Sequence, residues 1–488
     1  MDIVYKNGCI RQKLERLNEK QNLRVLDLFS GCGGLSLGFH KAGYEIIANV
    51  ELDEEAVLSH AINFHKDHAN FCQFSKPRDI QKITPEILFE ELGYLQKPEE
   101  LVDVIVGGPP CQAFTRIGRA KLRETFKDSK AFLKDQRSQL YKTYLDYVRA
   151  LMPLVVLMEN VPDMLNYGGI NIADLACNDL SSFGYNCNYT ILNTAHFGIP
   201  QMRERVFIIA VHKCVESQIY FPKPSHHVEL PKGYHGSRSV ALKLIKLQIE
   251  NRYFIKPPEP SDNSKVALTA KDALSDLPKI TVHLKNKLKG GARNLNASIP
   301  YENRNAENEF QQLMRSWPDL QSNGNVTANA IRLLPRDYPI FRKMKPGDQY
   351  PEAVKIAKKI FQTKLLKESR STGIIPSERT KKYKRLLQET IPPYDDKKFP
   401  NKWRKMEEDK PARTLMAHLG KDSYSHIHYD SSQARTISVR EAARLQSFPD
   451  GFQFYGAMNS VFRQIGNAVP PLIAEKLAIT IKNILLKE

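Results

Sequence analysis

One short stretch constrains this chain more than any other. An apolar run from Val102 to Val106 predicts a short buried strand, and the two glycines and two prolines that follow end it abruptly. Cys111 comes next, so we expect its sulfur at a strand tip, on a turn that the prolines stiffen. Open α/β sheets bind their ligands at such tips. The stretch therefore predicts an α/β fold whose site contains a thiol.

Further strand ends in the N-terminal half carry polar groups. A predicted strand, Arg24–Phe29, runs into Ser30-Gly-Cys-Gly-Gly34, which opens a helix. Glycines in such a turn let the backbone approach a nucleoside-bearing ligand closely. The next predicted strand, 45–50, ends at Glu51, a carboxylate that suits a ribose diol. We expect Asp79-Ile80 to close a third strand in the same way.

An acid and an arginine complete the set of polar groups. The predicted strand 154–158 leads directly into Glu159, and a proline follows shortly after. Arg203 and Arg205 alternate in the segment 201–205, between the predicted strands 188–193 and 206–211, so a strand conformation would point both side chains to one face. A thiol, an acid and an arginine are therefore expected at neighbouring strand ends.

This combination favours one kind of chemistry. A cysteine attacks as the thiolate, which basic surroundings stabilise. Cysteine proteases need a histidine base, and no histidine here lies in a recognisable catalytic motif, His196 being the nearest candidate. A cysteine with an acid points instead to conjugate addition on a pyrimidine. The thiolate adds to C6, the acid donates a proton to N3, and C5 becomes electron-rich enough to accept a methyl group.

Composition narrows the partners and the compartment. The 488 residues predict two or three domains, and a net charge of +18 favours a polyanionic partner, most often nucleic acid. Seven scattered cysteines without paired metal-ligand spacing indicate a reducing compartment and no metal site. No signal core and no apolar run of the roughly 20 residues that a bilayer span needs are present, so we expect a soluble cytoplasmic protein and no membrane partner.

The middle of the chain differs from its flanks in amino-acid composition and in apolar periodicity. Residues 112–136 are basic and lack apolar periodicity, which predicts a mobile loop able to close over phosphates. Residues 221–400 are rich in prolines, lysines and asparagines and read as a separate module. Basic clusters there, with aromatic residues between them, fit a surface that reads a nucleic acid; the clusters are 285–289, 342–345 and 381–385, and the aromatic residues are Trp317, Tyr338, Phe341, Tyr350 and Tyr383.

Regular structure returns towards the C-terminus. Residues 437–445 predict a helix with Ser438 as its N-cap and Glu441 three positions later, which is a capping box. A last helix is predicted over 472–486.

These motifs together resemble the DNA (cytosine-5) methyltransferases of the prokaryotic restriction–modification type. The resemblance covers nearly the whole chain, in the family's motif order. The matching stretches are Asp27-Leu-Phe-Ser-Gly-Cys-Gly-Gly34, Gly108-Pro-Pro-Cys-Gln-Ala-Phe114, Glu159-Asn-Val161, Gln201-x-Arg203-x-Arg205, Arg440-Glu-Ala-Ala-Arg-Leu-Gln-Ser-Phe-Pro449 and Gln464-x-Gly-Asn-Ala-Val469.

The resemblance implies a role for each of these residues. Cys111 would be the nucleophile, Glu159 would engage N3 and the amino group of cytosine, and Arg205 would approach O2, with Arg203 beside it. S-adenosyl-L-methionine would be the methyl donor, and no metal is needed. The residues expected around that donor are Phe29, Gly31, Cys32, Gly34, Glu51, Leu52, Asp79, Ile80, Pro110, Leu140, Asn467 and Val469. Leu52 stands where many members have tryptophan, which implies weaker stacking.

The family also implies a fold and a partner. We expect a Rossmann-like, mixed, mostly parallel sheet with helices on both faces, and a smaller target-recognition domain. The domains would be 1–220 (catalytic), 221–400 (target recognition) and 401–488, which closes the small domain and returns a helix to the catalytic one. The partner would be duplex DNA with the target cytosine flipped out. A monomer on DNA is expected, associated with a prokaryotic nucleoid, with a restriction endonuclease acting separately.

Two alternatives remain open at this point. An RNA cytosine methyltransferase of the same superfamily would carry the same motifs, although its recognition region is short, whereas 221–400 is long. A degenerate homologue could bind DNA or the donor without turnover, although Cys111, Glu159 and Arg205 are intact.

Overall fold

The computed structural model describes residues 2–110, 140–167, 169–247 and 252–487. These residues form two compact units. Unit 1 comprises residues 1–267, 453–455 and 468–488, and unit 2 comprises 268–452 and 456–467. The predicted basic loop 112–136 lies outside the described residues. None of the helices in the described part of the chain has both the length and the apolar character that crossing a membrane requires.

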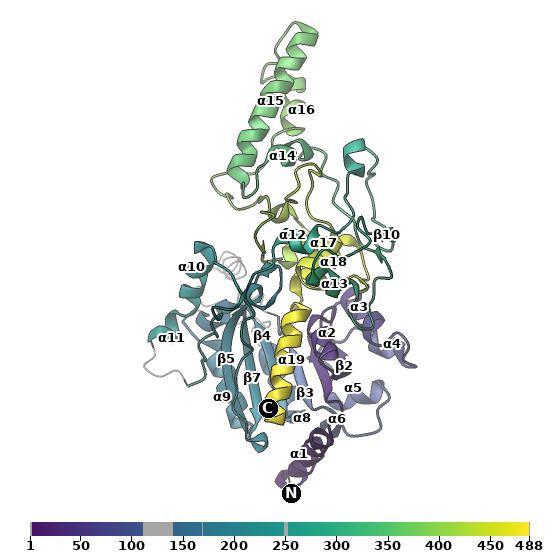
Figure 1. The fold of residues 1–488 in the computed structure, drawn as a ribbon, viewed down its shortest axis with the longest axis vertical. Coiled ribbons are helices and arrows are strands. Elements are labelled where there is room, and N and C mark those ends of the chain that lie inside the picture. The colour runs from purple at the N-terminus through teal and green to yellow at the C-terminus, as the bar shows by residue number, and fades with distance from the viewer. Residues whose placement is uncertain (1, 111–139, 168, 248–251, 488) are drawn as a thin grey trace. The chain divides into compact units, whose positions relative to one another are not determined.

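Unit 1 is built on a six-stranded sheet in the order β2-β1-β3-β4-β7-β5 (Figure 1). The pairs β1–β2, β1–β3 and β3–β4 are parallel, whereas β7 runs antiparallel to both β4 and β5. The mixed, mostly parallel sheet expected from the sequence is thereby confirmed. Its strands are β1 (Arg24–Leu28), β2 (Glu45–Val50), β3 (Val104–Gly107), β4 (Val155–Asn160), β5 (Tyr185–Asn193) and β7 (Glu204–His212).

The strand order places helices on both faces of this sheet. The step from β1 to β2 moves towards one edge and the step from β3 to β4 towards the other. Because parallel crossovers are right-handed, α2 (Gly34–Lys41) and α8 (Leu140–Leu151) cover opposite faces. Strand β4 is buried along its whole length, as expected for a strand covered on both sides.

The C-terminal helix packs on the same face as α2. Helix α19 (Pro471–Leu486) accepts a hydrogen bond from the Tyr44 hydroxyl at its Ala478 carbonyl, at 3.0 Å. Its Glu475 also pairs with Lys41 of α2 at 3.0 Å. Helix α19 therefore belongs to unit 1 together with α2.

Shorter elements complete unit 1. The remaining helices are α1 (Asp2–Asn18), α3 (Glu54–Phe64), α4 (Phe71–Phe74), α5 (Pro85–Glu91), α6 (Pro98–Leu101), α9 (Ile172–Ser182), α10 (Lys232–Ala241) and α11 (Lys243–Leu247). The short strands are β6 (Gln201–Met202), β8 (His226–His227) and β9 (Lys265–Val266).

Unit 2 has little sheet and several helices, one of them long. These are α12 (Ala270–Leu274), α13 (Glu309–Arg315), α14 (Tyr338–Lys343), α15 (Tyr350–Thr372), α16 (Lys381–Gln388), α17 (Val439–Leu445) and α18 (Met458–Asn467). The strands are β10 (Ile299–Pro300), β11 (Asn325–Val326) and β12 (Ala412–Arg413). The capping box of Ser438 and Glu441 is present at α17, as predicted.

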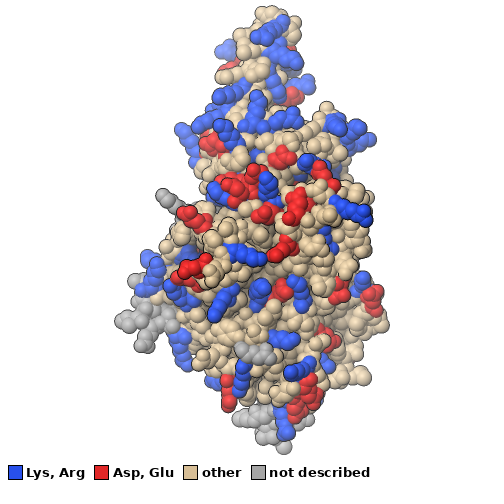
Figure 2. Space-filling model, in the orientation of Figure 1, with Lys and Arg blue, Asp and Glu red and all other residues tan. Residues whose placement is uncertain are grey.

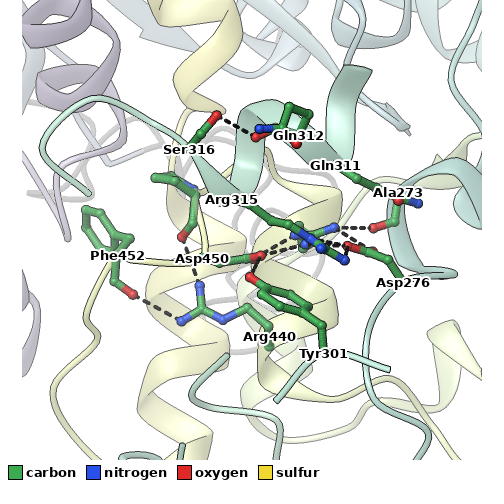
Figure 3. Close-up of polar contacts among 12 residues, drawn as sticks. Ala273, Asp276, Tyr301, Gln311, Gln312, Arg315, Ser316, Arg440, Asp450 and Phe452 are labelled. Atoms are coloured by element: carbon green, nitrogen blue, oxygen red, sulfur yellow. Dashed lines mark hydrogen bonds and ion pairs between the residues drawn. The ribbon is translucent and has the colours of Figure 1, made fainter. Parts of the chain in front are cut away.

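A buried polar network, and not a large sheet, connects several helices of unit 2. The fully buried guanidinium of Arg444 pairs with Asp276 at 3.0 Å and with Asp450 at 2.5 Å. Arg315 shares Asp276 at 2.7 Å, and the Tyr301 hydroxyl hydrogen-bonds to Asp450 (Figure 3). The network thus joins α17 to α12, α13 and the segment around residue 301.

The aromatic residues of the central module do not form the expected surface. Trp317, Phe341 and Tyr350 are fully buried, and Tyr338 is 7% exposed. Tyr338, Phe341 and Tyr350 belong to an apolar core that also contains Trp403. For these four residues the prediction that they interleave with basic side chains on a surface is therefore wrong, because they are buried, whereas Tyr383 in α16 is half-buried.

Candidate active site

The ends of β4 and β7 bring the predicted acid and arginine together. Glu159 is the penultimate residue of β4, and Arg205 is the second residue of β7. Since these strands are antiparallel neighbours, the end of one lies beside the start of the other. Arg205 Nε lies 2.9 Å from Glu159 Oε1, and both side chains are largely buried. The two side chains form an ion pair that is largely shielded from solvent.

The chain that leads to Cys111 passes directly beside this pair. A Cβ built on Gly108 would lie 3.0 Å from Glu159 Oε2, so the backbone there runs against the carboxylate. Asn160 Nδ2 donates to the Pro109 carbonyl at 3.2 Å, which ties the turn to the end of β4. Cys111 itself lies outside the described residues. Pro110, described and half-buried, is the last residue before it.

Arg203 lies close in sequence but in a different setting. It falls in the break between β6 and β7, and its side chain is 1% exposed. Its carbonyl accepts a hydrogen bond from Thr194 N at 2.9 Å. The two arginines do not lie in one strand, because β7 begins only at Glu204, so the condition for both side chains to share one face is not met.

A second group of predicted residues surrounds the glycine-rich turn after β1. Phe29, Gly31 and Gly33 all have positive φ angles, of 58°, 55° and 97°. Gly33 is the N-cap of α2, and Gly34 begins that helix. A Cβ on Gly34 would lie 2.2 Å from the carbonyl oxygen of Val469, so only glycine permits this approach. The Val469 carbonyl therefore lies against the start of α2.

Glu51 closes the turn from the adjacent strand. Its carboxylate accepts backbone hydrogen bonds from Gly31, Leu52 and Asp53, each at 2.8 Å. Burial raises the pKa of this carboxyl, while the three backbone donors act in the opposite direction. Leu52 beside it is 67% exposed, an apolar side chain open to a ligand. The turn, the carboxylate and the exposed leucine form one cradle.

Asp79 and Ile80 lie in a turn and not at the end of a strand, where the sequence predicts them. The turn lies between α4 and α5 and closes no strand, so that prediction is wrong. Arg78 N donates to the Glu51 carbonyl at 2.7 Å, which fixes the turn against the end of β2. Asp79 is half-buried and Ile80 is 6% exposed.

Three further predicted residues differ in their surroundings. Cys32 is 1% exposed, and burial raises the pKa of its thiol, so the side chain faces the interior of the turn. Leu140 is the first residue of α8 and is half-buried. Asn467 ends α18 in unit 2 and is exposed.

A buried polar chain below the turn was not anticipated. Ser36 Oγ lies 2.6 Å from Asp27 Oδ2 and 2.9 Å from His60 Nε2. All three side chains are fully buried, and burial raises the pKa of Asp27 to about 7. Burial also holds the pKa of His60 well below its ordinary value. Sequence gave no signal for His60, because it lies within an apolar helical pattern.

No group of three or more histidine, cysteine or acidic residues in the described ranges is arranged to bind a metal ion. The first cluster above is the Glu159–Arg205 pair, and the second is the glycine turn with the Glu51 carboxylate.

Comparison with known proteins identifies the family. Residues 23–483 match the family model of the C-5 cytosine-specific DNA methylases. A protein of Oceanobacillus iheyensis named "Putative type II methyltransferase M.OihORF3336P" is 39% identical over 95% of this chain and 96% of its own. The type II methyltransferase M.AgeI of Thalassovita gelatinovora is 31% identical over 94% of this chain and 99% of its own.

A solved structure supports the fold. The crystal structure of a protein encoded within an Escherichia coli prophage aligns with a TM-score of 0.60 and 22% identity, covering 96% of this chain and 100% of that one. The fold, the motif order and the family match agree. The chain therefore belongs to the C-5 cytosine-specific DNA methylases and is a DNA (cytosine-5) methyltransferase.

Proposed function

We propose that the protein methylates C5 of a flipped-out cytosine in duplex DNA, through a covalent bond between Cys111 and C6, with S-adenosyl-L-methionine as the methyl donor. The observation that carries the proposal is the Glu159–Arg205 ion pair at 2.9 Å, with Gly108, three residues before Cys111, lying against the same carboxylate. This closeness of Gly108 to Glu159 supports the proposal that Cys111 and Glu159 act on the same base.

The residues around the glycine turn fit the donor. A nucleoside needs close backbone approach, an acceptor for its ribose hydroxyls and an apolar contact for its base. The positive-φ turn at Gly31 and Gly33, the Glu51 carboxylate and the exposed Leu52 supply these three features. When bound, S-adenosyl-L-methionine would supply an electrophilic methyl group.

The protein's side chains would then act in order. The Cys111 thiolate forms a bond to C6, and the electron pair of the C5–C6 double bond becomes available at C5. Glu159 stabilises the adduct by giving a proton to N3, and Arg205 holds the Glu159 carboxyl and approaches O2. C5 then takes the methyl group as the bond between that methyl group and the donor sulfur breaks. A solvent base removes the C5 proton, N3 returns its proton to Glu159, and the C5–H electron pair re-forms the double bond and expels the Cys111 thiolate. Base flipping is required, because a stacked cytosine cannot reach such a site.

The domain roles and the biological setting are part of the proposal. Residues 1–220 would carry catalysis, 221–400 would recognise the DNA sequence, and 401–488 would complete the small domain and return the last helix. Because the named relatives are type II methyltransferases, we propose that this protein protects DNA as a monomer, beside a separately acting restriction endonuclease, in a prokaryotic cytoplasm.

Bisulfite sequencing of DNA from cells that express the protein tests the reaction and reveals the modified site. We expect protected cytosines within one recurring sequence. The Cys111→Ser variant should leave no protected cytosine yet still bind duplex DNA. Duplex DNA containing 5-fluorocytosine at the modified position should become covalently trapped on the wild-type protein only. Methylation by the serine variant would overturn the assignment of the nucleophile.

A further inference from the structure

Helices α15 and α16 form a hairpin that extends from the rest of unit 2 (Figure 1). Helix α15, of 23 residues, buries one side, including Tyr350, Ala357 and Phe361. Helix α16 has no buried residue and leans on α15 through the Phe361–Tyr383 ring contact at 5.1 Å. Lys364 Nζ also donates to Thr390 Oγ1 at 2.8 Å, just beyond α16. We call residues 350–389 the basic hairpin.

The basic hairpin carries a large share of the protein's net charge. It holds eleven lysines and arginines against four glutamates, a net +7 out of +18 for the whole chain. In Figure 2, blue basic side chains cover α15 and α16, with few red acidic ones among them. Because so many positive charges lie close together, they repel one another, and a bound polyanion would relieve this repulsion.

The local glutamates neutralise few of these charges. Glu368 pairs with Lys382 at 2.8 Å, and Glu389 with Arg385 at 2.7 Å. Glu352 accepts the backbone N–H of Gln349 in a capping box. Eight exposed basic residues of the hairpin have no ion pair within the described residues; these are Lys355, Lys358, Lys359, Lys367, Arg370, Arg379, Lys381 and Lys384.

The unpaired charges of α15 form a stripe opposite its buried side. At 100° per residue, the basic residues on the half of the helix that faces away from Ala357 and Phe361 are Lys355, Lys359, Lys367 and Arg370, and Lys358 lies at the border of that half. From residue 355 to residue 370 the stripe is about 22 Å long at 1.5 Å per residue. That length spans roughly 6 base pairs of duplex DNA at 3.4 Å each.

We propose that the basic hairpin is a DNA-backbone arm, which binds the phosphates of the duplex through the lysine stripe of α15 and reads no bases. The inference rests on the proposed recognition of DNA by residues 221–400. Lysine ammonium groups act as point charges and lack the two-pronged geometry that specifies a base, so a lysine stripe suits phosphates. The arm would raise affinity for any sequence and leave the choice of target cytosine to other residues.

Anionic lipid is the competing partner. The turn between the helices exposes Ile374 by 73% and Ile375 by 59%, and an apolar tip with basic flanks can also bind a membrane surface. DNA is favoured because the enzyme already acts on DNA and because the charge lies along the helix, away from the tip.

The test measures binding to a mixed-sequence 40-base-pair duplex as a function of salt, with no methylation required. The variant K355Q/K358Q/K359Q removes three exposed charges, two within the stripe and one at its border, and K66Q/K213Q/K223Q removes three exposed charges of unit 1 as the matched control. Each lost phosphate contact lowers the slope of log K against log[salt] by about 0.9, so we expect a slope smaller by roughly 2 to 3 and affinity reduced roughly 10- to 100-fold at 150 mM salt.

Two further measurements make the outcome of this experiment decisive. The variant K355R/K358R/K359R should restore the wild-type slope, and circular dichroism should show equal helix content in all variants. A slope equal to that of the control would overturn the proposal, as would loss of binding to phosphatidylglycerol vesicles with an unchanged DNA slope. Because the duplex assay is independent of turnover, a failed bisulfite experiment would refute the proposed reaction and leave the arm's DNA binding separately measurable.

Discussion

Arg205 Nε lies 2.9 Å from Glu159 Oε1, and the two residues come from antiparallel neighbours in the sheet. The same carboxylate has Gly108 against its other oxygen. Glu159 is thus held between a cation on one side and the turn that leads to Cys111 on the other. A carboxyl held in this way can present one defined face to a base.

The first prediction concerns this ion pair. Arg205→Lys replaces a planar guanidinium with a point charge, so Glu159 should lose its fixed orientation. We expect kcat to fall roughly 100-fold, while the Kd for duplex DNA stays within about twofold. Arg238→Lys is the matched control, because Arg238 pairs with Glu204 at 2.6 Å, next in sequence to Arg205. Equal losses in the two variants would show that the effect is not specific to Glu159.

The second prediction compares two helical glycines. Gly34→Ala in α2 would place a Cβ 2.2 Å from the Val469 carbonyl, whereas a Cβ on Gly8 in α1 meets nothing within 4 Å. Gly34→Ala should therefore weaken binding of S-adenosyl-L-methionine at least tenfold in calorimetry and lower the unfolding temperature. Gly8→Ala should leave binding unchanged and stabilise the fold by about 0.5–1 kcal/mol. Normal donor binding by the Gly34 variant would contradict the cradle.

Sequence predicted the sheet well because the buried strands leave strong local signals. The run 45–50 matches β2, and Ser438 with Glu441 caps α17 as predicted. These features depend on neighbours in sequence, where apolar runs and capping residues decide the outcome. Glu51 directly follows β2 and Glu159 is the penultimate residue of β4, as expected because polar groups at strand ends interrupt apolar runs, whereas Asp79 and Ile80 close no strand.

Sequence failed where tertiary packing decides. The aromatic residues around 317–350 read as an exposed surface, but unit 2 needs them as its core. Helix α15 was missed because its lysines obscure the apolar stripe of Ala357 and Phe361. Arg444, Asp276 and Asp450 are far apart in sequence, and no local pattern indicates that they pair.

The third prediction follows from the pKa of Asp27, which burial raises to about 7. The folded protein therefore keeps a proton that the unfolded chain releases near pH 4, so stability should fall as pH rises from about 4 to about 7 and level off above. Asp27→Asn keeps the contact with Ser36 and cannot ionise. We expect it to be more stable than wild type at pH 8, by on the order of 3 kcal/mol, and to show no advantage at pH 4. Urea unfolding at both pH values measures this, and parallel pH curves for the two proteins would refute it.

The fourth prediction concerns the buried network of unit 2 (Figure 3). Asp276 is fully buried and accepts hydrogen bonds from both Arg315 and Arg444. Asp276→Ala would leave Arg444 with one carboxylate for a charge that water cannot reach, and removing one partner of a buried pair costs about 3–5 kcal/mol. Lys382→Ala is the control, because its ion pair with Glu368 is solvent-exposed and such pairs contribute about 0–1 kcal/mol. Urea unfolding should separate the two variants clearly. Similar small losses would mean that the aromatic core, rather than the ionic network, holds α17 in place.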